Sequence, residues 1–221
     1  MKSFQEIGIK LTDKINYHRY DRFYPRFLES LRDKKFNMLE IGFGGGNSYP
    51  FIAGGSLKLW KEYFPHAYIN VVDINNEGED DRSKVFKLDQ SKKDDLQYIV
   101  DNIPKCKFII DDGSHHPYHQ FITFIKLFDE LLEDGGVYII EDIECNYWKS
   151  TSKIYGYEIG HFNFMDLLKQ YPDKINKEFT KVDNPLNLSS ITFGHNCVII
   201  TKSTHGEVEL KNRNYRFNHN I

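Results

Sequence analysis

Short apolar runs alternate with amphipathic stretches along most of the chain. The apolar runs predict strands over residues 36–41, 68–73, 85–88, 108–111 and 137–140. Between them, helices are predicted from an N-cap at Ser56 to Pro65, over residues 94–102, and from Pro117 through Leu131 and Leu132, where apolar residues recur every three or four positions. Alternating strands and helices predict a parallel sheet with helices packed on its faces.

Both ends of the chain depart from this alternation. Residues 1–35 are polar and aromatic, with helical spacing from Tyr20 onward, and predict a helical segment that covers the sheet or a ligand. A further helix is predicted over residues 162–171, and residues 190–193 and 197–201 flank Gly194-His195-Asn196 as an antiparallel hairpin. The predicted fold is α/β, with a Rossmann-like, mostly parallel seven-stranded sheet that ends in this hairpin. The predicted divisions are a helical segment 1–35, a Rossmann-like domain 36–210 and a polar tail 211–221.

Polar residues stand at the ends of the first three predicted strands. They are Glu40 and Gly42 in a glycine-rich loop that runs to Gly46, Asp73 after the second strand, and Asp89 with Gln90 after the third. Open α/β sheets bind nucleotides at this edge, where one carboxylate can accept both ribose hydroxyls. A dinucleotide is disfavoured because Asn47 stands where the third glycine of its fingerprint belongs. Taken singly, the glycine-rich loop could be a tight turn, Asp73 a helix N-cap, and Asp89 with Gln90 a solvated turn. The joint placement of these residues at three strand ends favours a nucleoside site.

Acid pairs end the fourth and fifth predicted strands. The pairs are Asp111-Asp112 and Glu141-Asp142, and His115 follows the first. If the two strands are parallel neighbours, all these side chains reach one edge of the sheet. Hard oxygen ligands beside a histidine indicate a divalent cation and a base.

Other interpretations of the fourth-strand motif stay open. Asp112 or Ser114 could cap the helix that opens at Pro117, with the nearby histidines on the surface. His115, His116 and His119 could also bind zinc. The carboxylates favour magnesium, calcium or manganese over zinc.

Composition excludes several functional classes. Hydrophobic residues make up 40% of the 221 residues, enough for a core, and the net charge of −3 argues against a nucleic-acid partner. The three cysteines, Cys106, Cys145 and Cys197, have no metal-type spacing and fit a reduced compartment. The first residues lack a signal-peptide core, and no apolar stretch approaches a membrane span. A cytoplasmic protein without a membrane partner is therefore expected.

These motifs together carry a family resemblance. The residues concerned are Leu39-Glu-Ile-Gly42, Gly54-Gly-Ser-Leu-Lys-Leu-Trp-Lys-Glu-Tyr-Phe-Pro65, Asp73-Ile, Asp89-Gln90, Ile110-Asp-Asp-Gly-Ser-His115, Ile140-Glu-Asp142, Tyr147-Trp148, Asp13-Lys14…His18-Arg-Tyr20 and Phe193-Gly-His-Asn196. The chain resembles the class I S-adenosylmethionine-dependent methyltransferases, and more narrowly the metal-dependent sugar O-methyltransferases of the macrocin and mycinamicin type. The likeness covers nearly the whole chain.

The resemblance implies a role for each site residue. It places Glu40 and Gly42 by the methionine part of S-adenosylmethionine, Asp73 by the ribose, Asp89 and Gln90 by the adenine, Asp111 in support of that pocket, Mg²⁺ on Asp112, Glu141 and Asp142, and His115 as the base. The implied acceptor is a hydroxyl of a sugar, glycan or glycosylated small molecule. Cys145-Asn146 replaces the small hydroxyl residues that commonly precede the Tyr-Trp pair, and an additional N-terminal domain of some members is not expected. A homo-oligomer stays open because the family's assembly does not transfer.

Four rival functions use parts of the same pattern. A nicotinamide oxidoreductase fits the first loop poorly, and a nucleic-acid methyltransferase fits the charge poorly. A metal-dependent hydrolase would not need a nucleoside site, and a non-catalytic nucleotide-binding module would not need the acids with His115. Cofactor binding and metal dependence separate these alternatives.

Overall fold

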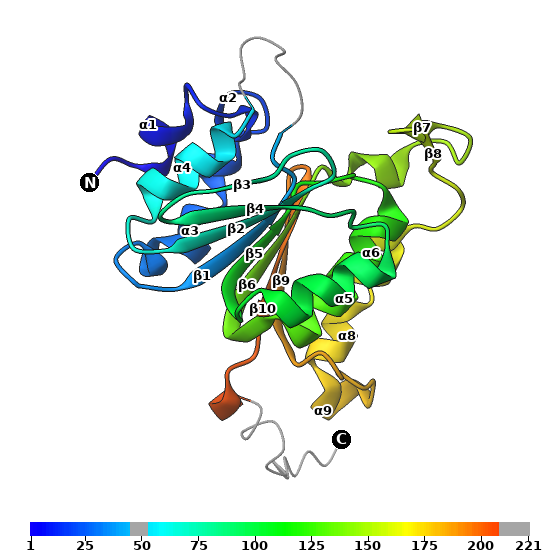
Figure 1. Cartoon of the computed structure of the whole chain (residues 1–221). Helices are drawn as coiled ribbons and strands as arrows, with labels where there is room; N and C mark the ends of the chain where they lie inside the picture. Colours follow the sequence, from blue (N-terminus) through cyan, green and yellow to red (C-terminus); the bar gives the residue numbers. More distant parts are fainter. Residues whose placement is uncertain (45–52, 208–221) are drawn as a thin grey trace.

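The computed structural model describes residues 1–44 and 53–207, which form an α/β fold around one mixed sheet (Figure 1). The eight strands lie in the order β3-β4-β2-β1-β5-β6-β10-β9. Their bounds are β1 Asn37–Ile41, β2 Tyr68–Asp73, β3 Gly78–Glu79, β4 Ser83–Lys87, β5 Cys106–Asp111, β6 Leu132–Glu141, β9 Leu188–Gly194 and β10 Cys197–Lys202. Strands β4, β2, β1, β5 and β6 are parallel, and β10 is antiparallel to both β6 and β9. The predicted sheet and hairpin are confirmed, and β3 adds a short antiparallel edge strand.

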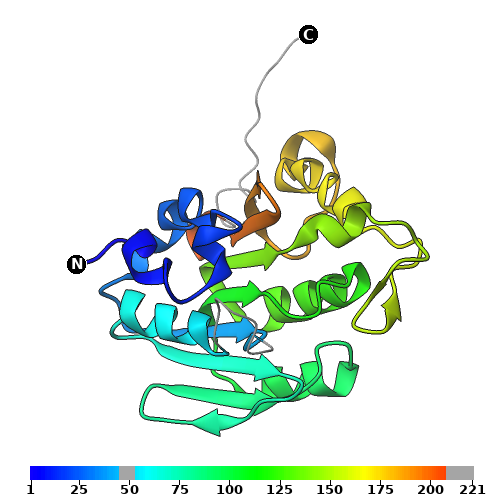
Figure 2. The same cartoon turned by 90° about the horizontal axis from the view of Figure 1, so that it is seen from above.

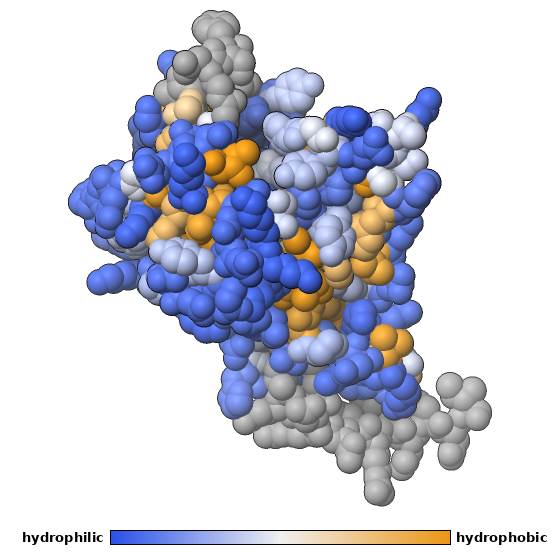
Figure 3. Space-filling model, turned by 45° about the vertical axis from the view of Figure 1, so that its right-hand side comes forward, coloured by the Kyte–Doolittle hydropathy of each residue, from blue (hydrophilic) through white to orange (hydrophobic). Residues whose placement is uncertain are grey.

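Helices cover both faces of the sheet. One face carries α5 (Lys93–Asn102) and α6 (Pro117–Glu130), and the other carries α4 (Gly55–Tyr63) with the N-terminal helices (Figures 1 and 2). Successive strand residues point to opposite faces. Accordingly, Ile109 packs in the cluster that contains the α6 side chains, while Phe108 and Ile110 pack in the cluster that contains Trp60 of α4. The surface seen in Figure 3 is mostly hydrophilic, with hydrophobic side chains in separate patches.

The N-terminal segment is a chain of short helices. They are α1 Phe4–Gly8, α2 Asp13–Asn16, the 3-10 turn η1 Tyr20–Arg22, α3 Pro25–Leu28 and the 3-10 turn η2 Glu29–Leu31. The helical spacing predicted from Tyr20 holds, because Tyr20, Tyr24, Leu28 and Leu31 are all buried. Pro25 opens α3, where its missing N–H costs no helical hydrogen bond.

The region after β6 holds small elements. They are the 3-10 helix η3 Ile143–Tyr147, the hairpin β7 Lys153–Ile154 and β8 Tyr157–Glu158, and the helices α7 Phe164–Leu168, α8 Tyr171–Ile175 and α9 Lys177–Thr180. The single helix predicted over 162–171 is therefore wrong. It divides before Tyr171 because Pro172 cannot continue a preceding helix and instead sits in the first turn of α8.

Two other local predictions are also wrong. Helix α4 is capped by Gly54 in the left-handed region, at φ 73°, and not by Ser56, which lies inside the helix and donates its hydroxyl to Glu40. Helix α6 ends at Glu130, and Leu132 opens β6 opposite Cys106 of β5, because pairing across the sheet outweighs the helical spacing.

No helix within residues 1–44 and 53–207 has the length and apolarity to cross a bilayer. The later part of the glycine loop and the predicted tail 211–221 lie outside the described residues.

Candidate active site

A cavity of about 460 Å³ opens at the carboxyl ends of the parallel strands. The predicted site residues that line it are Gly42, Asp73, Asp89, Gln90, Asp112, His115 and Asp142. Leu11, Thr12 and Asp13 of the N-terminal segment form part of the wall, and Tyr155 and Tyr157 of the β7–β8 hairpin form another part. This volume lies within the range of roughly 300–1,000 Å³ that holds small-molecule ligands.

Asp73 joins the loops that follow β1 and β2. Its Oδ2 accepts a hydrogen bond from the backbone N–H of Phe43 at 3.1 Å, and its Oδ1 accepts from the backbone of Asn75 and Asn76 at 2.8 Å. Partial burial raises the pKa of Asp73, but these hydrogen bonds outweigh it and hold the pKa below its usual value. The next element is the strand β3, so Asp73 is not a helix N-cap but an ionised acceptor on the cavity wall.

Gly42 allows two strand ends to approach closely. Its φ is 98°, and a Cβ at this position would lie 2.2 Å from the backbone oxygen of Asp112. Any other residue would therefore push the β1 and β5 loops apart. Glu40, the residue before last of β1, is fully buried and does not line the cavity, and its Oε2 accepts a hydrogen bond from Ser56 at 2.9 Å. Burial raises the pKa of Glu40 to about 7.

Gln90 both lines the cavity and holds its floor together. Its Nε2 donates to the two carboxylate oxygens of Asp111, at 3.1 and 3.2 Å, and to Thr123 at 3.1 Å. Its Oε1 accepts from the backbone N–H of Ser114 at 2.6 Å. Asp111 is fully buried beneath the cavity, and burial raises its pKa to about 6. Asp89, at the rim, accepts from the backbone and hydroxyl of Ser91.

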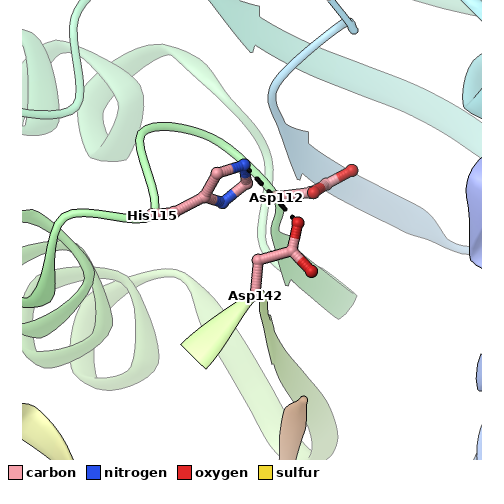
Figure 4. Close-up of side chains that lie close together, drawn as sticks. All are labelled: Asp112, His115 and Asp142. Carbon is pink, nitrogen blue, oxygen red and sulfur yellow. Dashed lines mark ion pairs between the residues drawn. The ribbon is translucent and has the colours of Figure 1, made fainter. Parts of the chain in front are cut away.

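Asp112, His115 and Asp142 converge at the end of the cavity (Figure 4). One ligand atom from each lies within 4.8 Å of the others, and His115 Nε2 is 3.6 Å from Asp142 Oδ2. His115 and Asp142 have positive φ values of 55° and 52°, a strained backbone state for residues other than glycine. Such strain clusters at functional sites, where the surrounding structure enforces it.

The described residues do not adopt the alternative roles considered for the fourth-strand motif, a helix cap at Asp112 or Ser114 and a zinc site of three histidines. Helix α6 is capped by His116, whose Nδ1 accepts from the N–H of Tyr118, and not by Asp112 or Ser114. His116 Nε2 donates to the backbone oxygen of Glu158, and His119 Nδ1 lies 3.1 Å from the Ser114 hydroxyl. The three-residue group found in the described part of the chain includes His115 but neither of these histidines, so a three-histidine zinc site is not formed.

Glu141 does not join this group. Its Oε2 accepts from Lys14 Nζ at 2.6 Å and its Oε1 from the Tyr24 hydroxyl at 2.5 Å, and its side chain is 2% exposed. Lys14 also lies 2.5 Å from Asp112 Oδ2 and 3.8 Å from Glu40 Oε1. Burial alone would lower the pKa of Lys14, but the three carboxylates raise it well above its usual value. Local patterning does not predict this contact, because Lys14 stands in a polar stretch typical of an exposed helix start; only the family resemblance singles out the Asp13-Lys14 pair.

The N-terminal segment and the hairpin turn also hold Asp142. Its Oδ1 accepts from the Tyr20 hydroxyl at 2.8 Å and from Asn196 Nδ2 at 2.9 Å. His18 Nδ1 lies 3.5 Å from the same oxygen, and the His18 and Tyr20 rings are stacked. Asp142 Oδ2 is the oxygen that faces His115. Segments far apart in the sequence thus fix the orientation of one carboxylate.

Known proteins with similar sequences are sugar O-methyltransferases. The 2'-O-methyltransferase of 8-demethyl-8-alpha-L-rhamnosyl tetracenomycin-C from Streptomyces olivaceus is 34% identical over 146 residues, 65% of this chain and 38% of the relative. The mycinamicin VI 2''-O-methyltransferase from Micromonospora griseorubida is 35% identical over 140 residues, 62% of this chain and 35% of the relative. The chain therefore spans little more than a third of these curated relatives. No protein-family model matches the chain.

Solved structures of the MycE methyltransferase from the mycinamycin pathway are similar over most of the chain. The complex with Mg, SAH and mycinamycin VI superposes with a TM-score of 0.78 at 27% identity, covering 92% of this chain and 55% of that chain. The complex with Mg and SAH in a second crystal form gives a TM-score of 0.79. The protein has the fold of the class I S-adenosylmethionine-dependent methyltransferases. Within that class it resembles the sugar O-methyltransferases of the macrocin and mycinamicin type, as the sequence motifs predicted.

Proposed function

We propose that the protein is an S-adenosylmethionine-dependent O-methyltransferase that methylates a hydroxyl of a sugar or glycosylated small molecule. The observation that carries the proposal is the Asp112, His115 and Asp142 group at the end of a cavity whose other wall holds Asp73 and Asp89. This arrangement lies in a fold similar to MycE, which was solved with Mg, SAH and a glycosylated compound. SAH is S-adenosylmethionine without its methyl group.

The cofactor is proposed to lie along the ends of β1, β2 and β4. The Asp73 carboxylate, which stays ionised, can accept both ribose hydroxyls. Gly42, which lines the cavity without a side chain, is proposed to lie by the methionine part, and Asp89 by the adenine. Gln90 and Asp111 support this pocket through their buried hydrogen bonds, and Glu40 supports the first loop through Ser56.

The acidic end of the cavity fits a divalent cation. Oxygen ligands around one Mg²⁺ or Ca²⁺ at roughly 2.0–2.6 Å lie within about 4–5 Å of one another. A carboxylate oxygen of Asp112 lies within 4.8 Å of one of Asp142, which fits this separation. Two carboxylates beside one imidazole favour magnesium or manganese. A cation bound here would stabilise negative charge on the acceptor oxygen. Asp112 and Asp142 are the proposed ligands, and Glu141 would join them only if it left Lys14 and Tyr24.

His115 is the proposed base. A neutral imidazole can take the hydroxyl proton, and the acceptor oxygen then attacks the sulfonium methyl while the carbon–sulfur bond breaks. Asp142 lies beside His115 Nε2, and the strained backbone fixes the ring at the cavity wall. General-base catalysis contributes about 10²–10⁴-fold to the rate.

The proposal is tested by incubating the purified protein with S-adenosylmethionine, Mg²⁺ and a panel of glycosides that carry vicinal hydroxyls. Mass spectrometry should detect a product heavier by one methylene unit, and a chelator should abolish it. Methyl transfer that is unaffected by the chelator would contradict the metal, and transfer to no member of the panel would contradict the sugar acceptor.

The base role of His115 is separated from a ligand role by His115→Gln. If His115 is the base, kcat should fall by about 10²-fold or more while Mg²⁺ affinity stays within about twofold of the wild type. A large loss of Mg²⁺ affinity would identify His115 as a ligand instead. His161→Gln is a matched control, since that histidine lies outside the cavity lining.

A further inference from the structure

Lys14 is a buried lysine within a group of carboxylates. Its side chain is 1% exposed, and its Nζ lies 2.5 Å from Asp112 Oδ2, 2.6 Å from Glu141 Oε2 and 3.8 Å from Glu40 Oε1. Lys14 comes from α2, whereas the three acids come from β1, β6 and the loop after β5. The contact therefore closes the N-terminal segment onto the end of the sheet.

The charge balance makes this ammonium important. Glu40 and Glu141 are almost fully buried, and in the described part of the chain Lys14 is the lysine or arginine that pairs with them. Buried carboxylates are costly unless a counter-charge and hydrogen bonds compensate them. Lys14 places one positive charge among these three acids.

Asp112 belongs to both the Lys14 contact and the proposed metal group. One of its oxygens is held by the ammonium, and both oxygens of Glu141 are held by Lys14 and Tyr24. The ammonium thus occupies carboxylates that a divalent cation would otherwise bind. We propose that Lys14 is a resident counter-cation that competes with the divalent metal for Asp112 and Glu141 and so sets the metal affinity of the site.

The competing explanation is that Lys14 only anchors the N-terminal segment. A second buried lysine offers a comparison, because Lys202 donates to the backbone oxygens of Phe128, Asp129 and Leu132 and, within residues 1–44 and 53–207, to no carboxylate. Both lysines lose buried hydrogen bonds when replaced by methionine. Only the loss of Lys14 should change how the protein binds a metal.

The expected effect follows from the charges. Lys14 Nζ lies 2.5 Å from an oxygen of Asp112, a proposed ligand of the dication. In general, a unit positive charge about 5 Å from a dication weakens its binding by about tenfold, even at a dielectric constant of about 80, so removing the charge strengthens it. Release of Glu141 as an additional oxygen ligand acts in the same direction. The inference rests on the metal site in the proposed function. Metal binding by the wild type tests that site, and the difference between the Lys14 variants and the wild type tests the competition.

The experiment is a calorimetric titration of Mn²⁺ alone into the wild type, Lys14→Met, Lys14→Gln and Lys202→Met. Both Lys14 variants should bind Mn²⁺ about tenfold or more tightly than the wild type, and Lys202→Met should match the wild type. Metal-free Lys14→Met should also have a lower Tm than the metal-free wild type. Added Mn²⁺ should restore more of this loss of Tm in Lys14→Met than it restores in Lys202→Met. Lys14→Gln keeps an N–H donor and serves if Lys14→Met does not fold.

Equal or weaker Mn²⁺ binding by a folded Lys14 variant would overturn the competition while leaving the metal site in place. No binding by the wild type with clear binding by Lys14→Gln would support the competition in its strongest form. No binding by any of the four proteins would overturn both this inference and the metal in the proposed function.

Discussion

Replacing Gln90 by leucine should destabilise the protein and disturb the loop that carries His115. Gln90 is 4% exposed, and its amide bridges Asp111 on β5, Thr123 on α6 and the backbone of Ser114. Leucine has a similar size but no polar atom. The substitution therefore removes the bridge without opening a large cavity.

The magnitude follows from the partners that would be left unsatisfied. The Ser114 N–H would lose its acceptor at about 1–3 kcal/mol, and the Asp111 carboxyl would lose a donor at about 1.5–3 kcal/mol. The added apolar surface of leucine offsets part of this loss. We expect a net loss of about 3–5 kcal/mol in the free energy of unfolding, or about 6–20 °C in Tm for a chain of this size.

Urea denaturation followed by circular dichroism measures this change. Gln97→Leu is the control, because Gln97 is exposed on α5 and bonds to Asp101 and Lys126 at the surface; its free energy of unfolding should change by less than about 0.5 kcal/mol. A loss of less than about 1 kcal/mol in Gln90→Leu would refute the reasoning and return Gln90 to a purely ligand-facing role.

Two further predictions concern the cavity wall. Gly42→Ala should cost about 2 kcal/mol more in unfolding free energy than Gly44→Ala, since both glycines have positive φ but only at Gly42 would the Cβ meet the backbone of Asp112; equal losses in urea denaturation would contradict this. Burial lowers the pKa of His119 to about 4, so the neutral ring stabilises the fold above pH 6.5, and this contribution is lost as the pH falls toward 4. Between pH 6.5 and 4, the free energy of unfolding of His119→Gln should therefore fall by up to roughly 3 kcal/mol less than that of the wild type. Parallel pH profiles of the unfolding free energy of the two proteins would contradict this.

The layered fold could be predicted because local sequence patterns indicate most of its strands and helices. The apolar runs at β2 and β5 have the length and flanking residues of buried strands, and the α6 face repeats at helical spacing. The boundaries of an element depart from the local pattern where pairing across the sheet competes with local preference. Leu132 follows the helical period but pairs with Cys106 in the sheet.

The site could be predicted only as far as strand ends determine it. Asp73, Asp112 and Asp142 reach the cavity because parallel strands end at one edge. The partners of the acids come from Lys14 and Tyr20, over a hundred positions away in sequence from Glu141 and Asp142, and no local pattern encodes such a contact. Glu141 matched the motif for a metal ligand, yet its direction depends on these partners. The specific ligand, base and cofactor roles remain predictions.

The central claim is tested most directly by titrating S-adenosylmethionine into the purified protein by calorimetry, with and without Mg²⁺. The account predicts saturable binding in the micromolar range, weakened in Asp73→Ala because that variant loses the proposed ribose acceptor. Absence of binding under both conditions would contradict the methyltransferase proposal and favour a metal-dependent hydrolase or a non-catalytic binding module.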